Sequence, residues 1–103
     1  MIVELREYTL HMGQVPAYVK LYEEEGFAIQ GPILGNLVGY YWTEVGPQNQ
    51  IVHLWGYDSY EDRAERRARL QADERWQAYL AKIRPMIVSQ TNRILNPSRV
   101  MDL

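Results

Sequence analysis

The stretch IVHLWGYDSYEDRAERRARL, residues 51–70, decides the fold because it holds a strand and a helix in direct succession. Its first seven residues are mainly aliphatic or aromatic, with His53 among them, which is typical of a buried strand. Ser59, followed three residues later by Asp62, resembles a capping box and predicts a helix that runs to about Ala72. Asp58, followed three residues later by Glu61, is an alternative cap.

Five further elements are predicted when the same criteria are applied outward from this stretch. They are a strand over residues 2–10, a helix that begins near Pro16, a strand over 36–46, a helix over 74–83 capped by Asp73, and a strand over 86–95. The turn-forming sequence GPQN joins the second strand to the strand over residues 49–57 as a hairpin. The uncharged segment 26–43 is expected to hold a helix end, a loop and a strand rather than a membrane span, because glycine and proline interrupt it.

The order strand-helix-strand-strand-helix-strand predicts one α+β domain over residues 1–103. We expect the first and third strands to be parallel neighbours in a four-stranded antiparallel sheet, with both helices on one face. The strands are apolar at both parities, so the other face would expose tyrosine, tryptophan and aliphatic side chains to solvent. A homodimer that packs sheet against sheet through this open face is therefore predicted.

Composition excludes several classes of partner. The net charge of -2 argues against nucleic acid and anionic membranes, which would require a basic surplus. The sequence has no cysteine, which excludes disulfides and favours a reducing compartment. The first ten residues include charged side chains and lack a run of signal-peptide length. We therefore expect a soluble, cytoplasmic protein.

Motifs for metal, phosphate and nucleophilic chemistry are missing from the sequence. With only two histidines, a histidine-rich metal site is excluded; a mixed histidine-carboxylate site stays conceivable, but no tight ligand cluster is visible. Glycine-rich phosphate loops and the HExxH and GxSxG motifs are absent. The serines have no local nucleophile signature. The sequence therefore predicts no metal and no cofactor.

Alternation along two strands predicts a patch of polar and aromatic side chains. His53 and Trp55 share a parity on the third strand, and Glu4, Arg6 and Tyr8 share one on the first. A register that places both sets on one face would create a wall on which a flat organic ligand could stack. A histidine in such a wall could exchange a proton near neutral pH.

Two interpretations of this patch remain open. Tyr40 and Trp42 on the second strand would extend it as a binding wall. Alternatively, His53 is a buried residue satisfied by Glu4 or by a backbone carbonyl, and the aromatic rings fill a dimer core. On residue patterns alone, the second interpretation is favoured.

The arginines of the central helix fall into two groups. Those that follow an acid by four residues form ordinary surface pairs. Arg67 lies on the helical stripe that should face the sheet, and Arg63 lies on its shoulder. Arg67 would pair with an inward carboxylate or hold an anionic ligand between helix and sheet, and the ion pair is favoured.

Three segments of the chain resemble the NIPSNAP family: YTLHMGQVPAY, the run from Leu37 to Leu70, and DERWQAYL with the later LNP. The most specific parts are the run from Gly39 to Trp55 and the spacing of Tyr57, Ser59, Asp62, Arg63 and Arg67. The resemblance implies a ferredoxin-like βαββαβ fold that pairs as a dimeric α+β barrel with the helices outside. The chain looks like the bacterial single-domain form.

Two functions remain open. Related branches of the superfamily that the resemblance implies include cofactor-free monooxygenases, haem-degrading enzymes and lactone isomerases, which use a cleft between sheet and helices. By that analogy, the chain would bind or convert a small aromatic or carbonyl compound, with His53 as the catalytic acid-base and with Arg6, Tyr8, Trp42, Trp55, Arg63 and Arg67 as binding residues. A haem role would require an axial ligand, and none of the predicted helices contains a histidine. The alternative is a non-catalytic dimeric binding module in which the same residues are packing.

Overall fold

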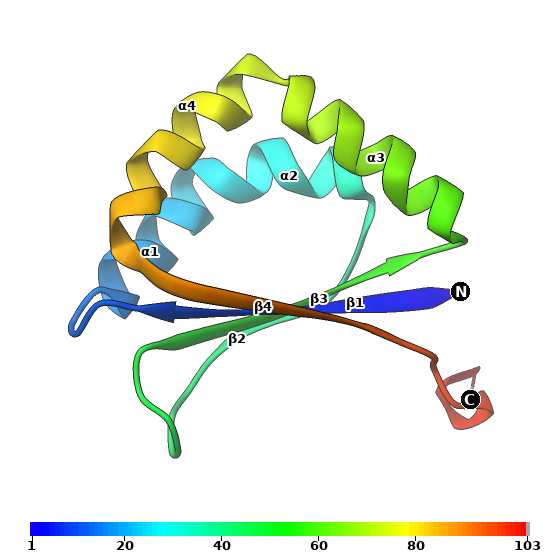
Figure 1. The fold of residues 1–103 in the computed structure, drawn as a ribbon, viewed down its shortest axis with the longest axis horizontal. Helices are drawn as coiled ribbons and strands as arrows, with labels where there is room; N and C mark the ends of the chain where they lie inside the picture. The colour runs from blue at the N-terminus through cyan, green and yellow to red at the C-terminus, as the bar shows by residue number, and fades with distance from the viewer. Residues whose placement is uncertain (103) are drawn as a thin grey trace.

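The computed structural model of the protein describes residues 1–102. It confirms the predicted order of elements and the α+β class (Figure 1). The elements are β1 (Ile2–Leu10), α1 (Val15–Leu21), η1 (Tyr22–Gly26), α2 (Phe27–Leu34), β2 (Asn36–Trp42), β3 (Gln50–Tyr57), α3 (Tyr60–Ala72), α4 (Glu74–Ile83), η2 (Arg84–Met86), β4 (Ile87–Leu95) and η3 (Arg99–Asp102).

The four strands form one antiparallel sheet in the order β2-β3-β1-β4, as in ferredoxin-like folds. The expectation that the first and third strands run parallel is wrong, because β1 pairs with β3 antiparallel. The helical crossover makes β1 parallel to β2, and the hairpin then reverses the direction of the chain in β3. All four α-helices lie on one face of the sheet, as predicted (Figure 1).

The first helical segment is longer than predicted. It continues beyond Gly26 and through Pro32 to Leu34, and the expected loop is reduced to Gly35. The helix ends at Gly35, which adopts a φ of 90°, a left-handed conformation that glycine tolerates and other residues rarely adopt. The Gly35 N–H donates to Gly31 O at 2.8 Å. Between α1 and α2 the segment makes one π-helical turn, η1. None of the helices in residues 1–102 is long and apolar enough to cross a lipid bilayer.

Side-chain caps set the first residues of α3 and α4, as the sequence predicts. Ser59 Oγ accepts a hydrogen bond from the backbone N–H of Asp62 at 3.0 Å, so Ser59 is the cap of α3. Asp73 accepts from the backbone N–H groups of Arg75 and Trp76 and begins α4. The two helices are therefore separated by a single residue, and the chain bends there over the sheet.

The strand register sorts the side chains onto two faces. Glu4 pairs with Trp55, Arg6 with His53 and Tyr8 with Ile51, so the polar-aromatic patch lies on one face, beneath the helices. The opposite, open face carries Val3, Leu5, Glu7, Val52, Leu54, Tyr41, Arg93 and Leu95. The expectation that tryptophan would be exposed on the open face is not met, because the two strand tryptophans, Trp42 and Trp55, lie on the helix side. Tyr41 is exposed on the open face, as expected of tyrosine.

Candidate functional site

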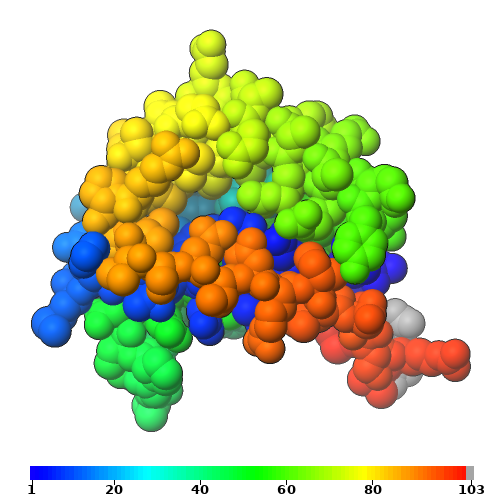
Figure 2. Space-filling model, in the orientation of Figure 1, coloured from blue at the N-terminus to red at the C-terminus, as the bar shows by residue number. Residues whose placement is uncertain are grey.

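A cavity of about 210 Å³ lies between the sheet and the helices. Figure 2 shows the surface hollowed between β4 and the layer formed by α3 and α4, with atoms of the N-terminal strand visible inside. The sheet contributes the inner wall of the cavity through Arg6, Tyr8, Tyr40, His53 and Gln90. Since these side chains come from all four strands, the register of the whole sheet positions the site.

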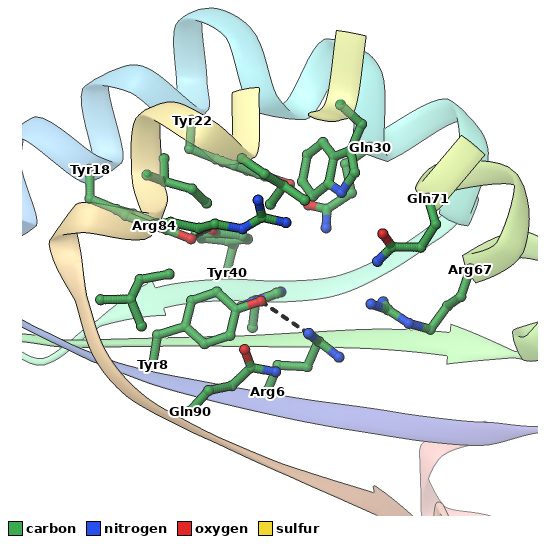
Figure 3. Close-up of a pocket in the computed structure, with 15 residues that line it drawn as sticks. Arg6, Tyr8, Tyr18, Tyr22, Gln30, Tyr40, Arg67, Gln71, Arg84 and Gln90 are labelled. Carbon is green, nitrogen blue, oxygen red and sulfur yellow. Dashed lines mark hydrogen bonds between the residues drawn. The ribbon is translucent and has the colours of Figure 1, made fainter. Parts of the chain in front are cut away.

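The helices contribute the opposite wall of this cavity (Figure 3). Its members are Tyr18 from α1, Tyr22 from η1, Gln30 from α2, Arg67 and Gln71 from α3, Trp76, Leu80 and Ile83 from α4, and Arg84 from η2. Tyr22 donates its hydroxyl to Gln30 Oε1 at 2.7 Å, and both side chains are buried. In Figure 3 Arg67 extends from α3 toward Arg6.

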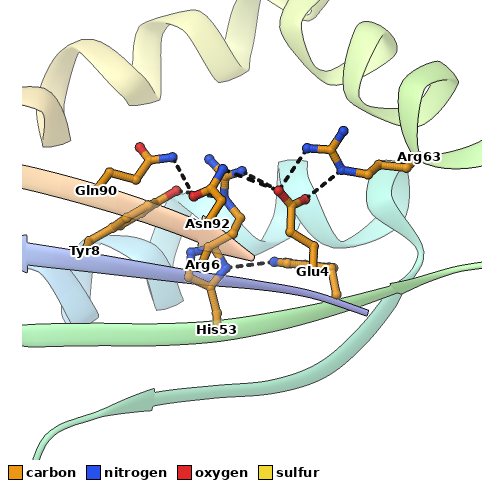
Figure 4. Close-up of polar contacts among 8 residues, drawn as sticks. Glu4, Arg6, Tyr8, His53, Arg63, Gln90 and Asn92 are labelled. Carbon is orange, nitrogen blue, oxygen red and sulfur yellow. Dashed lines mark hydrogen bonds and ion pairs between the residues drawn. The ribbon is translucent and has the colours of Figure 1, made fainter. Parts of the chain in front are cut away.

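Glu4 is the centre of a buried ion-pair network next to the cavity (Figure 4). Its carboxylate accepts from Arg6 Nη1 at 3.1 Å and from Arg63 Nε and Nη2 at 3.1 and 2.9 Å. Arg6 also donates Nε–H to the Tyr8 hydroxyl at 3.2 Å. Burial alone would raise the pKa of Glu4, but the hydrogen bonds from Arg63 and the charges of the surrounding arginines hold that pKa below its usual value. Glu4 is therefore ionised, and it joins α3 to the sheet.

His53 is enclosed by aromatic rings and is 1% exposed. Its imidazole stacks on Tyr40 at a centroid distance of 4.7 Å and contacts the edge of Tyr8 at 5.0 Å. Trp55 donates its indole N–H to His53 Nδ1 at 2.8 Å. Because Nδ1 accepts this bond, the neutral imidazole carries its proton on Nε2. Nε2 has no hydrogen-bond partner among the described residues, so it presents a free N–H donor.

The environment of His53 keeps the ring neutral. Burial, together with the positive charges of Arg6 and Arg67, lowers the pKa of His53 from 6.5 to about 3. A folded-state pKa below the unfolded value means that stability is fully present above pH 6.5. That stability is lost as the pH falls toward 3, because the unfolded chain binds a proton that the folded chain does not.

We expect the free energy of unfolding to fall by about 2 kcal/mol between about pH 7.5 and pH 5 because of His53. Glu4 does not contribute in this window, since its pKa lies below its ordinary value of 4.5. Urea unfolding at a series of pH values measures the slope. His53→Gln should remove most of it, whereas His11→Gln, at an exposed position in the loop after β1, should retain it. An equal slope in wild type and His53→Gln would contradict a buried neutral imidazole.

The two candidate arginines of α3 have different surroundings. Arg63 makes the ion pair with Glu4 and is absent from the cavity lining. Arg67 lines the cavity, and its Nη1 is buried with no hydrogen-bond partner in geometric range among the described residues; the buried Tyr57 hydroxyl, which is likewise unpaired, lies next to the guanidinium. The inward carboxylate that the sequence suggested as a partner for Arg67 is Glu4, and Glu4 pairs with Arg63, one helical turn before Arg67.

The predicted site residues lie in more than one place in the structure. Arg6, Tyr8, His53 and Arg67 come together at the cavity. Trp55 is fully buried behind His53 and contacts the site through its indole N–H. Trp42 is 53% exposed and lies in a separate surface groove, next to η1 and the start of α2. Sequence patterns did not single out Gln30, Gln71, Arg84 or Gln90, because polar residues on helix flanks and edge strands are ordinary surface residues in a sequence.

No cluster of three or more histidine, aspartate and glutamate side chains lies close enough to hold a metal ion within the described part of the chain. The described cavity lining contains no carboxylate. It is composed of guanidinium, amide, imidazole and hydroxyl groups on a scaffold of aromatic and aliphatic side chains. Such a lining offers hydrogen-bond donors to an organic ligand rather than ligands to a cation.

Comparison with known proteins decides the family. The family model for NIPSNAP matches residues 3–100. The chain belongs to the NIPSNAP family. A NIPSNAP family protein with unknown function from Agrobacterium tumefaciens has the same fold with a TM-score of 0.94 and 52% identity, over 96% of this chain and 89% of that one. A NIPSNAP-like domain protein from Burkholderia xenovorans is 49% identical with a TM-score of 0.94, over 95% of this chain and 85% of that one.

Two further proteins are more distantly similar to this chain, one in sequence over part of its length and the other in fold. The Protein NipSnap homolog of Dictyostelium discoideum is 32% identical over 97 residues, which are 94% of this chain and 43% of that protein. The chain thus spans less than half of the length of this relative. A protein named antibiotic biosynthesis monooxygenase is 10% identical with a TM-score of 0.65, over 95% of this chain and 99% of that one, and shares the fold.

Proposed function

We propose that this NIPSNAP domain binds, and converts, a small aromatic or carbonyl compound in the cavity between sheet and helices. One observation carries the proposal: His53 and Arg67 both line one cavity, and each has a buried donor, Nε2–H of His53 and Nη1 of Arg67, with no hydrogen-bond partner among the described residues. An unsatisfied buried donor costs about 1–3 kcal/mol. An oxygen atom of a ligand that accepts from both groups would remove that cost.

The volume of the cavity limits the ligand to one ring or a short chain. The cavity of about 210 Å³ is smaller than the pockets of about 300 Å³ or more that hold drug-sized ligands. A cavity of about 150 Å³ in another protein accommodates benzene, so a single substituted ring fits. The aromatic side chains of Tyr8, Tyr18 and Trp76 line the cavity and give it a wall against which such a ring would pack.

The chemistry proposed for His53 is that of a neutral hydrogen-bond donor. Its Nδ1 is occupied by Trp55, and its low pKa keeps the ring uncharged, so it donates Nε2–H to a carbonyl oxygen rather than removing a proton. Arg67 adds a fixed positive charge near the same oxygen. This arrangement stabilises negative charge on a ligand oxygen, whether the charge is present in the bound ligand or grows during its conversion.

We further propose that the protein acts as a homodimer joined through the open face of the sheet. The apolar side chains of Leu5, Val52, Leu54 and Leu95 on that face support this proposal, because each is partly exposed and all four described α-helices lie on the other face of the sheet (Figure 1). A second copy offers a matching surface, since a twofold interface uses the same patch on both subunits.

Blocking the mouth of the cavity tests the proposed binding function. Gln71 is exposed and lines the cavity, so Gln71→Trp should fill the entrance at little cost in stability. In a thermal-shift screen of single-ring compounds with a carbonyl, carboxyl or phenol group, binders should raise the Tm of the wild type by at least about 4 °C at saturating concentration. The same compounds should leave the Tm of Gln71→Trp unchanged.

Ala72→Trp is the matched control for this screen. Ala72 is the next residue of α3, is exposed and does not line the cavity, so the same bulky side chain there should leave binding intact. The proposed function would be wrong if no compound stabilised the wild type. It would also be wrong if the compounds stabilised Gln71→Trp as strongly as the wild type.

A further inference from the structure

Positive charge exceeds negative charge in the layer between the sheet and α3. The guanidinium groups of Arg6, Arg63 and Arg67 surround the carboxylate of Glu4, which forms ion pairs with Arg6 and Arg63. Arg67 makes no ion pair with any side chain that the structure describes. One carboxylate compensates one cation, so this partly desolvated layer carries surplus positive charge.

Hydrogen-bond donors also exceed acceptors inside the cavity. Arg67 Nη1 and His53 Nε2–H have no partner among the described residues. Gln30 uses its amide oxygen to accept from Tyr22, so its amide N–H groups are left as donors. The hydroxyl oxygen of Tyr8 accepts from Arg6, which leaves the hydroxyl proton of Tyr8 to be donated. A ligand that fits these groups must be rich in acceptors.

We propose that the occupant of this cavity is a small organic carboxylate whose anionic group is bound by Arg67 and by the Nε2–H of His53. This inference rests on the proposed function and specifies the ligand class of the same cavity. A carboxylate satisfies both donors, forms charge-assisted hydrogen bonds with a guanidinium, and compensates the surplus charge. It is planar and presents two oxygens, and the remaining wall is aromatic, so the organic part is expected to be flat.

The mouth of the cavity is built to admit an anion. Gln71, Arg84 and Gln90 are exposed side chains from three different elements, and all three line the cavity. Arg84 therefore places a cation at the entrance, where it would attract a negatively charged compound before Arg67 binds it. Trp76 and Tyr40 lie along the same cavity and would contact the uncharged part of the ligand.

Matched ligand pairs test the inference by calorimetric titration. The pairs are benzoate with benzamide and phenylacetate with phenylacetamide, and phenyl phosphate is added as an alternative anion. In the wild type, each acid should bind at least about tenfold more tightly than its amide, the usual difference for a hydrogen bond to a charged group. Arg67→Gln should abolish the preference, Arg67→Lys should retain part of it, and Arg69→Gln should keep it in full. Arg69 lies on the same helix and loses the same charge, but it is exposed and outside the cavity.

The spectrum of ¹⁵N-labelled histidine gives a second readout that does not depend on affinity. Benzoate should shift the ring signals of His53 in the wild type and in Arg69→Gln, but not in Arg67→Gln. Amides that bind as tightly as acids, or an acid preference that survives Arg67→Gln, would overturn the carboxylate assignment and leave cavity binding intact. Tighter binding of phenyl phosphate than of benzoate would replace the carboxylate by a phosphate. Failure of every acid and amide to bind the wild type would overturn this inference, and failure of the whole single-ring screen would overturn the proposed function as well.

Discussion

Glu4→Gln is expected to lower the free energy of unfolding by about 3–5 kcal/mol, the usual cost of breaking a buried ion pair. The Glu4 side chain is 0% exposed, and its carboxylate binds both Arg6 and Arg63. Glutamine has nearly the same shape but leaves the buried Arg6 cation without a carboxylate. Urea unfolding near neutral pH measures the change. All variants are compared at one protomer concentration, since association would also contribute to the measured stability.

Glu65→Gln is the matched control for this experiment. Glu65 pairs with Arg69 at 3.9 Å on the outer surface of α3, and the two side chains are 73% and 54% exposed. Removal of this carboxylate should change the free energy of unfolding by no more than about 0.5 kcal/mol. Equal stabilities of Glu4→Gln and Glu65→Gln would contradict the assignment of Glu4 as the joint between α3 and the sheet.

Leu54→Glu is expected to convert the proposed homodimer into a monomer. Leu54 lies on the open face and pairs with Leu5 of β1, in the middle of the sheet. In a twofold interface each substitution occurs twice, so two carboxylates would be buried in an apolar contact without a partner. Sedimentation velocity should give a mass of about twice 12.1 kDa for the wild type and 12.1 kDa for the variant.

Tyr60→Glu serves as the comparison for this association experiment. Tyr60 is 61% exposed at the start of α3, so the same change from an apolar to an acidic side chain is made away from the open face. This variant should sediment as the wild type does. A wild-type protein that remains monomeric throughout the micromolar range would refute the proposed dimer, whatever the behaviour of Leu54→Glu.

Local rules predicted the elements of the second half of the chain closely. Ser59 and Asp73 are caps in the structure because their side chains accept the backbone N–H groups that every helix start leaves free. The same rules failed for the segment from Gly26 to Leu34. Glycine and proline are expected to end a helix, yet here the helix continues, because Leu34 is buried and Ile29 and Ile33 pack against the core.

The candidate site could be predicted only where it depends on the alternation along a strand. Parity placed Arg6, Tyr8 and His53 on one face, and the register of β1 and β3 brings them together. Arg63 and Arg67 both faced inward in the sequence pattern. Which of the two arginines pairs with Glu4 depends on the angle and position at which α3 crosses the sheet. Helical periodicity does not predict that angle or position. Trp76 of α4 also lines the cavity.

The π-helical turn of η1 determines which side chains of the first helical segment reach the cavity. Tyr18 and Gln30 are twelve residues apart, so on a regular α-helix they would point about 120° away from each other. The extra residue in a π-helical turn compensates for about 100° of this rotation, and both residues line the cavity together with Tyr22. The cavity therefore depends on helix geometry as well as on residue identity: if residues 22–26 wound as a regular α-helix with no residue removed, Gln30 would rotate by about 100° out of the binding wall. Deletion of one residue from this turn would instead leave Gln30 aligned with Tyr18.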